Sequence, residues 1–348
     1  MEIAIATGQD AAEWDRIVDE SSHGTIFHTW RWLKIVEKHT GSTLYPIVAY
    51  QSEKPAGIIP LFYQKNMQMG MVFSPPPDAA LYYLGPILIN DPGKRLHRRE
   101  TEYRNFQSAV DRFIRDELRA TYISISLPPG LTDPRPYKWA GYTVDPAYDY
   151  VLELGNGVDR QWRQLPKKVR QNVTRAEARG ISVVEGGREA LETLFSLMVK
   201  RYGEQRRVIS VPKNYLLELY DQYPASIKVF LALHEDEPVA GVADIIYKDR
   251  LYSWIGNPKP GTPISPSPND LLIWKEIQYG CNCGMQQYIT MSAAGNERLH
   301  GYYSSKMNPS LQLRFMVKKY SPVVGIMERL YSGVLKPIYE RFHTFDMR

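Results

Sequence analysis

The chain has 348 residues, about twice the usual length of a single domain, so we expect two domains. Its 43% hydrophobic and 23% charged residues exclude a disordered or fibrous protein. The formal net charge of +5 suits an anionic ligand such as CoA, a nucleotide sugar or tRNA, and equally suits a soluble protein with a slightly basic surface.

The sequence also indicates the cellular compartment and whether a metal site is expected. The N-terminus lacks the basic start and apolar stretch of a signal peptide, and no apolar run approaches the roughly 18 residues of a membrane span. Cys281 and Cys283 are the only cysteines, too few for a tetrahedral zinc site, so we expect free thiols. We therefore predict a cytoplasmic protein with no metal site and no tightly bound cofactor.

Hydrophobic periodicity predicts the elements of the first half. Helices are expected over residues 13–20, 29–39 and 100–118. Strands are expected over residues 81–89 and 121–127, and residues 44–64 alternate as in a hairpin with its turn at Ser52–Pro55. Loops are expected over residues 74–80 and 128–136.

The second half shows a similar succession. Strands are expected over residues 148–155, 181–186 and 287–292, with a strand meander over 227–257. Helices are expected over residues 188–203, 212–222 and 265–284, and a basic helix or helix pair is expected over residues 162–180. An amphipathic helical tail is expected over residues 323–348, interrupted by Pro337; its apolar side packs on the protein's own body or touches a membrane.

One segment is echoed between the halves. AYQSEKPAGII (49–59) resembles ALHEDEPVAGVAD (232–244), and each lies between an upstream helix and a downstream strand–helix–strand. Duplication of one unit explains the echo, although hairpins also converge on Pro and Gly through their turn chemistry. The repeated order predicts an α/β (α+β) fold with mixed sheets, in domains 1–150 and 151–322. A Rossmann fold is not indicated, because no G-x-G-x-x-G follows a first strand.

Six segments, in order along most of the chain, resemble the Fem family of aminoacyl transferases and the related double-GNAT acyltransferases. They are FHTWRWLKIVEKHTG (27–41), PAGIIPLF (55–62), YYLGPIL (82–88), LPKKVRQNVTRAEARG (165–180), SPNDLLIWKEIQYGCNCG (267–284) and NERLHGYYSSKMNPSL (296–311). The resemblance implies two tandem GNAT-like domains, each a mixed twisted sheet flanked by helices, with a groove between them.

The resemblance also implies an activity. Fem-like enzymes move an acyl or aminoacyl group from a carrier to an amine, with aminoacyl-tRNA as donor in the Fem branch and acyl-CoA in others. The expected acceptor is a phosphorylated sugar or peptide or a lipid-linked precursor. The expected partners therefore include this acceptor and tRNA but no DNA, with at most peripheral membrane contact. The resemblance suggests that Lys34, beside Trp32, meets the acceptor's phosphates.

Basic and polar residues at helix positions are candidates for binding anions. Lys168, Arg170 and Arg175 lie in the basic segment 162–180, where arginine could grip phosphates; a solvated charged face is the alternative. Ser267 and Asn269 precede a predicted helix and are either N-caps or part of an anion site.

Three further residues are candidates for catalysis. Asp244 is an acid within an apolar strand and is either a base or an outward-facing residue; Lys306 could stabilise the leaving group, and Tyr303 lies in the same closing segment. Trp254 either lines the groove or belongs to the core. An amine attacking an ester or thioester needs positioning and a route for one proton, so the lack of a nucleophile motif does not exclude an enzyme.

Two other functions stay open. One is an acyl-CoA-dependent GNAT N-acetyltransferase. The other is a non-catalytic GNAT-like binding or scaffold protein in polysaccharide or cell-envelope biosynthesis.

Overall fold

The computed structural model describes residues 1–66, 69–89, 93–206, 209–256, 265–291 and 297–321. Its helices are α1 (Ala11–Glu20), α2 (Trp30–Thr40), α3 (Leu96–Asp116), α4 (Arg135–Trp139), α5 (Val158–Gln164), α6 (Lys167–Ala178), α7 (Arg188–Glu204), α8 (Lys213–Gln222), α9 (Pro268–Asn282) and α10 (Glu297–Lys306). No helix among these residues is long and apolar enough to cross a bilayer.

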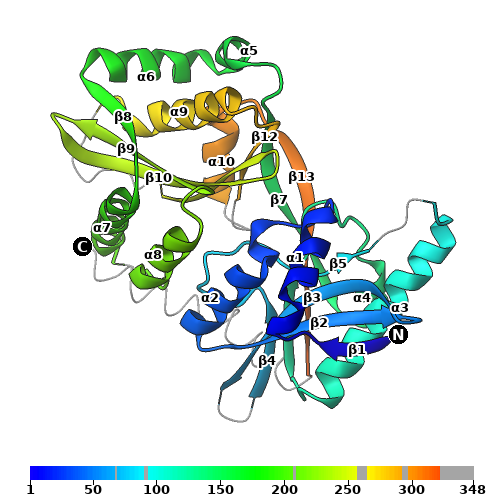
Figure 1. Ribbon diagram of the computed structural model, residues 1–348. Helices are drawn as coiled ribbons and strands as arrows, with labels where there is room; N and C mark the ends of the chain where they lie inside the picture. The colour runs from blue at the N-terminus through cyan, green and yellow to red at the C-terminus, as the bar shows by residue number, and fades with distance from the viewer. Residues whose placement is uncertain (67–68, 90–92, 207–208, 257–264, 292–296, 322–348) are drawn as a thin grey trace.

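The strands form one mixed sheet that runs through both halves (Figure 1). They are β1 (Glu2–Ile5), β2 (Thr43–Gln51), β3 (Lys54–Asn66), β4 (Met69–Ser74), β5 (Ile87–Leu88), β6 (Tyr122–Ser126), β7 (Thr143–Glu153), β8 (Ile181–Gly186), β9 (Ile227–His234), β10 (Glu237–Tyr247), β11 (Arg250–Gly256), β12 (Gln287–Thr290) and β13 (Ser310–Tyr320). The order is β1-β2-β3-β4-β6-β13-β7-β12-β11-β10-β9-β8, with β5 beside β3. The predicted mixed α/β class is confirmed.

The internal echo corresponds to two equivalent hairpins. Ser52 and Glu53 turn β2 into β3 with φ of 48° and 63°, and Glu235 and Asp236 turn β9 into β10 with φ of 54° and 62°. Positive φ at both central residues is typical of a type I′ turn, whose twist matches that of the strands. Each hairpin leads to a parallel strand pair, β4 with β6 and β11 with β12. The helices between the paired strands are α3 and α9, so both halves repeat one unit.

Three hydrophobic cores hold the sheet and helices together. The central core joins α1 and α2 of the first half to α7 and α8 of the second. A second core packs α6, α9 and residues of α10 on the other face of β9–β12, and a third packs α3 and α4 on the first half. The two halves therefore share a buried interface rather than meeting only at a linker.

Strand β13 joins the halves within the sheet. It pairs antiparallel with β6 through Met316–Tyr320 and with β7 through Ser310–Lys318. The predicted domain boundary after residue 150 falls inside β7, and the division into two domains stays a prediction. The predicted tail, residues 323–348, lies outside the described residues.

The predicted strand over residues 81–89 is wrong for most of its length, because only Ile87–Leu88 is a strand. Gly85 has φ of +74° and its N–H donates to Ser74 Oγ at 3.0 Å, and Pro86 has no N–H for a ladder. Helix α4 begins at Arg135, inside the loop expected over residues 128–136, and extends beyond it to Trp139. The structure also contains β1, β4, α10 and β13, which the periodicity did not predict.

Candidate functional site

The first half contains a crevice where the parallel strands β4 and β6 end. In open α/β sheets, ligands bind beyond the carboxyl ends of such strands. In the second half, β11 and β12 pair as far as Ser253 and Thr290, where β12 ends. Beyond this point β11 continues to Gly256 and pairs with β10.

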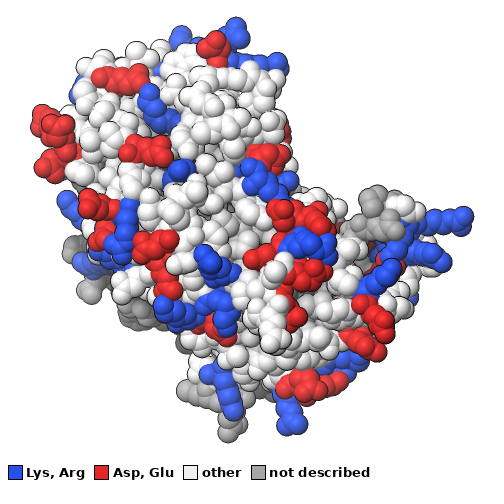
Figure 2. Space-filling view, in the orientation of Figure 1, with Lys and Arg blue, Asp and Glu red and all other residues white. Residues whose placement is uncertain are grey.

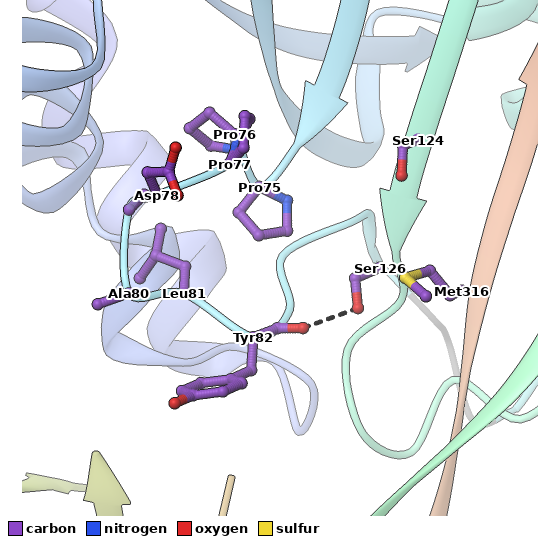
Figure 3. Close-up of a pocket in the computed structure, with 11 residues that line it drawn as sticks. Pro75, Pro76, Pro77, Asp78, Ala80, Leu81, Tyr82, Ser124, Ser126 and Met316 are labelled. Atoms are coloured by element: carbon purple, nitrogen blue, oxygen red, sulfur yellow. Dashed lines mark hydrogen bonds between the residues drawn. The ribbon is translucent and has the colours of Figure 1, made fainter. Parts of the chain in front are cut away.

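The crevice of the first half is a pocket of about 290 Å³. Figure 3 shows the segment after β4 curving around it, opposite the end of β6. The lining residues are Pro75, Pro76, Pro77, Asp78, Ala79, Ala80, Leu81, Tyr82, Ser124, Ser126 and Met316. Ser126 Oγ donates to the Tyr82 carbonyl at 2.8 Å, which closes one side of the pocket.

The second half holds the pocket loop in place. Tyr215 OH from α8 donates to the Ala79 carbonyl at 2.8 Å, and Trp254 Nε1 from β11 donates to the Ala80 carbonyl at 2.8 Å. Both side chains are almost fully buried. The pocket wall is therefore formed by one half and fixed by the other.

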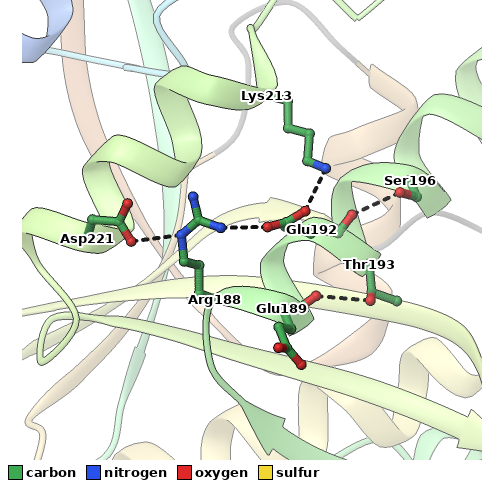
Figure 4. Close-up of polar contacts among 7 residues, drawn as sticks. All are labelled: Arg188, Glu189, Glu192, Thr193, Ser196, Lys213 and Asp221. Atoms are coloured by element: carbon green, nitrogen blue, oxygen red, sulfur yellow. Dashed lines mark hydrogen bonds and ion pairs between the residues drawn. The ribbon is translucent and has the colours of Figure 1, made fainter.

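Charged contacts fix α8 against α7 (Figure 4). Arg188 contacts Glu192 at 2.6 Å and Asp221 at 2.9 Å, and Lys213 contacts Glu192 at 2.7 Å. These groups are 35–47% exposed, so each pair contributes little alone. Together they orient the helix that carries Tyr215.

A buried ion pair lies behind the pocket. Arg314 of β13 is 3.2 Å from Asp149 of β7, and both are almost fully excluded from solvent. Arg314 also donates to Ser126 Oγ at 3.1 Å, and its guanidinium lies 5.9 Å from the centre of the Tyr83 ring. The last strand of the chain therefore supports the pocket of the first half.

A row of polar side chains crosses the sheet in the second half. Asp244, Ser253, Thr290 and Tyr150 are register partners on β10, β11, β12 and β7, so they face the same side of the sheet. The β10 ladder is irregular between Ala243 and Asp244. Such bulges re-aim a side chain and are common near active sites.

Glu276 of α9 lies over this row and faces Asp244. Ser253 Oγ and Tyr288 OH each donate to Glu276 Oε1 at 3.1 Å. Asp244 and Glu276 are both fully buried, so the outward-facing alternative for Asp244 is wrong. Glu276 makes the only polar contact of the Asp244 carboxyl group within the described chain. Two adjacent carboxyl groups without a cation must share a proton.

The environment shifts the pKa of both acids upward. Burial raises the pKa of Asp244 well above its ordinary value, and the charge of Glu276 raises it further. Burial raises the pKa of Glu276 to about 7, although hydrogen bonds from Asp244, Ser253 and Tyr288 oppose the shift. The pair can therefore exchange a proton near neutral pH.

Tyr303 of α10 lies near both the carboxyl pair and Tyr82, which lines the pocket. Burial raises the pKa of Tyr303, and negative charge on Glu276, Tyr82 and Asp244 raises it further. Burial likewise raises the pKa of Tyr82 to about 12. Tyr303 is half-buried, and its ring centroid is 6.5 Å from that of Tyr150. A half-buried tyrosine that keeps its phenolic proton at neutral pH therefore lies near the buried acids.

Lys306 is paired with an acid in this structure. Its Nζ is 2.6 Å from Asp270 Oδ1, and Asn172 Nδ2 donates to Asp270 Oδ2 at 2.6 Å. Ser267 caps α9, with its Oγ accepting from the Asn269 N–H at 3.4 Å. Asn269 is buried next to Tyr302, one residue before Tyr303. Lys306, Ser267 and Asn269 thus lie together where α9 begins, and their functional roles stay predictions.

The predicted phosphate-binding residues are more dispersed. Lys168 and Arg175 are exposed on α6, whereas Arg170 is half-buried and its Nε has no hydrogen-bond partner in the described residues. Lys34 is on α2, where it forms an exposed ion pair with Glu37. The structure does not bring Lys34 together with the basic residues of α6. The phosphate-binding roles of Lys34 and of α6 both stay predictions.

Trp32 and Trp254 belong to the central core. Their ring centroids are 5.8 Å apart, and Trp32 is fully buried. Trp254 supports the pocket loop through Ala80, as described above. In this arrangement the two rings do not line the described pocket; they support the loop that forms its wall.

The site contains residues that the sequence did not single out. These residues matter because of contacts with distant segments of the chain. The pairs are Glu276 with Asp244, Tyr82 with Tyr303, and Arg314 with Asp149. An acid inside the apolar helix 265–284 was the only available signal for Glu276.

Comparison with known proteins identifies the fold. A family model described as an acetyltransferase (GNAT) domain matches residues 163–298, and no curated protein matches the chain. FemX is 13% identical over 96% of this chain and 100% of its own, with a TM-score of 0.67. The C-terminal domain of a putative lysylphosphatidylglycerol synthetase from Agrobacterium fabrum is 11% identical over 94% of this chain and 97% of its own (TM-score 0.57).

A tandem GNAT protein from the clavulanic acid biosynthesis pathway is also similar. It is 12% identical over 92% of this chain and 98% of its own, with a TM-score of 0.55. At such identities these structures establish the fold rather than the substrate. The chain thus has the tandem GNAT fold that it shares with FemX, and the resemblance to the Fem and double-GNAT acyltransferases is confirmed at the level of the fold.

Proposed function

We propose that this protein is an acyltransferase that moves an acyl or aminoacyl group from a carrier to an amine on a phosphorylated or lipid-linked acceptor. The observation that carries the proposal is Tyr303, which lies near both the Asp244–Glu276 carboxyl pair and Tyr82 of the first-half pocket. This arrangement supplies a proton route beside a pocket that can hold a ligand.

The chemistry balances with these groups alone. The amine nitrogen forms a bond to the donor carbonyl carbon, and the bond from that carbon to the carrier's oxygen or sulfur breaks. The amine loses one proton and the leaving group gains one. Tyr303 can donate to the leaving group and recover a proton that the amine releases, with the carboxyl pair stabilising the exchange from behind.

Two donors are candidates, and a different observation favours each. Structural similarity to FemX over 96% of this chain favours an aminoacyl-tRNA, the donor that the resemblance to the Fem family implies. The acetyltransferase model matching residues 163–298 favours acyl-CoA as a second candidate.

The test is a transfer assay with each donor. Purified protein is incubated with acetyl-CoA or with a pool of aminoacyl-tRNAs, and with amine acceptors that include amino-sugar nucleotides and phosphorylated peptides. Mass spectrometry then identifies an acylated acceptor. Product from one donor supports the proposal and selects the donor. Binding of donors without product from any of them would contradict catalysis and favour a binding or scaffold role in the cell envelope.

A further inference from the structure

The two most exposed large hydrophobic side chains of the described residues lie on neighbouring helices. Leu96 begins α3 and Trp139 ends α4, and each is 63% exposed. Single exposed hydrophobic residues are common on protein surfaces, but exposed tryptophan is much less so. A shared surface bearing both suggests a binding role.

Leu96 is exposed because α3 extends beyond the sheet. Tyr103, Phe106 and Val110 form the buried stripe of α3, and Leu96 continues that stripe two turns earlier. Figure 1 shows the beginning of α3 projecting from the right-hand side of the molecule, away from the strands. The apolar stripe therefore runs past the point where the described sheet can cover it.

Arg135 links Trp139 to the first turns of α3. Its guanidinium is 5.6 Å from the centre of the Trp139 ring and forms an ion pair with Glu100 at 2.5 Å. Glu100 lies one turn after Leu96. The indole ring and the start of α3 are therefore parts of one surface.

This surface carries uncompensated positive charge. Arg95, Arg98 and Arg99 are exposed, and none makes a side-chain hydrogen bond or ion pair with the described residues. Three acids lie nearby: Glu102 contacts Lys94 at 2.8 Å, and Arg135 contacts both Glu100 and Asp133. The lysines and arginines of this end of the molecule outnumber these acids. Figure 2 shows Lys and Arg side chains gathered on this projecting end.

We propose that this surface, formed by Arg95, Leu96, Arg99, Lys138 and Trp139 and here called the α3–α4 rim, docks onto a membrane rich in anionic phospholipid. Arginine pairs with lipid phosphates, and tryptophan settles at the boundary between headgroups and acyl chains. A bilayer also removes Leu96 from water, which a nucleic acid backbone does not do. The inference rests on the surface alone and is independent of the proposed acyl transfer.

Sedimentation with vesicles tests the rim. The full chain is mixed with phosphatidylcholine vesicles with and without phosphatidylglycerol, at low and high salt. The key variant is Arg95→Glu with Arg99→Glu. Its matched control is Lys65→Glu with Lys200→Glu, which makes the same charge change at exposed lysines elsewhere. Trp139→Ser tests the apolar contribution, and far-ultraviolet circular dichroism checks the fold of each variant.

We expect wild-type protein and the lysine control to bind only the anionic vesicles. The double arginine variant should bind them at least about 25-fold more weakly, since each cation near such a surface contributes about fivefold. Salt should weaken wild-type binding, and Trp139→Ser should lower it further at high salt. The proposal would be overturned if the wild type bound no vesicles, or if both double variants lost binding equally. It would also be overturned if the wild type bound deacylated tRNA through the same arginines but bound no vesicles.

Discussion

Replacing Glu276 by glutamine should remove a pH-dependent loss of stability from the folded protein. The folded state holds the Glu276 proton up to about pH 7, whereas the unfolded chain releases it near the ordinary value of 4.5. The folded state therefore binds more protons between these values, so stability falls as the pH rises through this window. Glutamine keeps the acceptor oxygen for Ser253 and Tyr288, and its amide can donate to Asp244.

The size of the effect follows from the pKa difference. A shift from 4.5 to about 7 corresponds to about 3 kcal/mol between pH 4 and pH 8, at about 1.4 kcal/mol per unit. Full burial of the carboxyl group means that solvent screening reduces this figure little. The wild type should thus lose about 3 kcal/mol more than Glu276→Gln over this range.

Urea unfolding followed by tryptophan fluorescence, at several pH values, measures the difference. Glu189→Gln is the matched control, because Glu189 is exposed on α7 (Figure 4). The control should keep the pH dependence of the wild type. If Glu276→Gln keeps it too, Glu276 ionises freely and the shared-proton description of the pair is refuted.

Three other substitutions test the surrounding structure. Arg314→Leu removes the guanidinium from beside buried Asp149 and should cost about 3–5 kcal/mol in urea unfolding; a loss below about 1 kcal/mol would show that the pair is not effectively buried. Trp254→Phe removes the hydrogen bond to Ala80 and should cost about 1 kcal/mol, with faster amide exchange in residues 75–82; unchanged exchange would mean that the bond does not hold the loop. Arg170→Ala and Arg175→Ala should each weaken binding of a phosphorylated ligand in calorimetry without unfolding the protein, and wild-type affinity in both would exclude the basic face of α6 as the phosphate site.

Local patterns in the sequence predict much of the fold. The hairpin turns at Ser52 and Glu235, the amphipathic stripes of α2 and α3, and the cap of α9 depend on neighbours within a few residues. Strand β13 could not be predicted this way, because its pairing with β6 and β7 joins segments that are distant in the chain. The composition of residues 81–89 favours a strand, but Gly85 and Pro86 interrupt it and only Ile87–Leu88 pairs in the sheet.

The candidate site was only partly predictable for the same reason. Asp244 and Tyr303 were marked by an acid in an apolar strand and by a family-like closing segment. Their significance depends on Glu276, which faces Asp244 from a helix that begins more than twenty residues later. Burial and pKa shifts arise from such contacts and have no local signature in the sequence.

The central claim is that Tyr303 carries a proton in acyl transfer, and the turnover of Tyr303→Phe tests it most directly. Once the donor and acceptor are known, kcat is compared among wild type, Tyr303→Phe and Tyr45→Phe, a control on β2 whose ring contacts Tyr63 and Phe113. Loss of the phenol should lower kcat by about 100-fold or more with little change in KM, while the control stays active. A folded Tyr303→Phe variant with wild-type kcat would contradict the account.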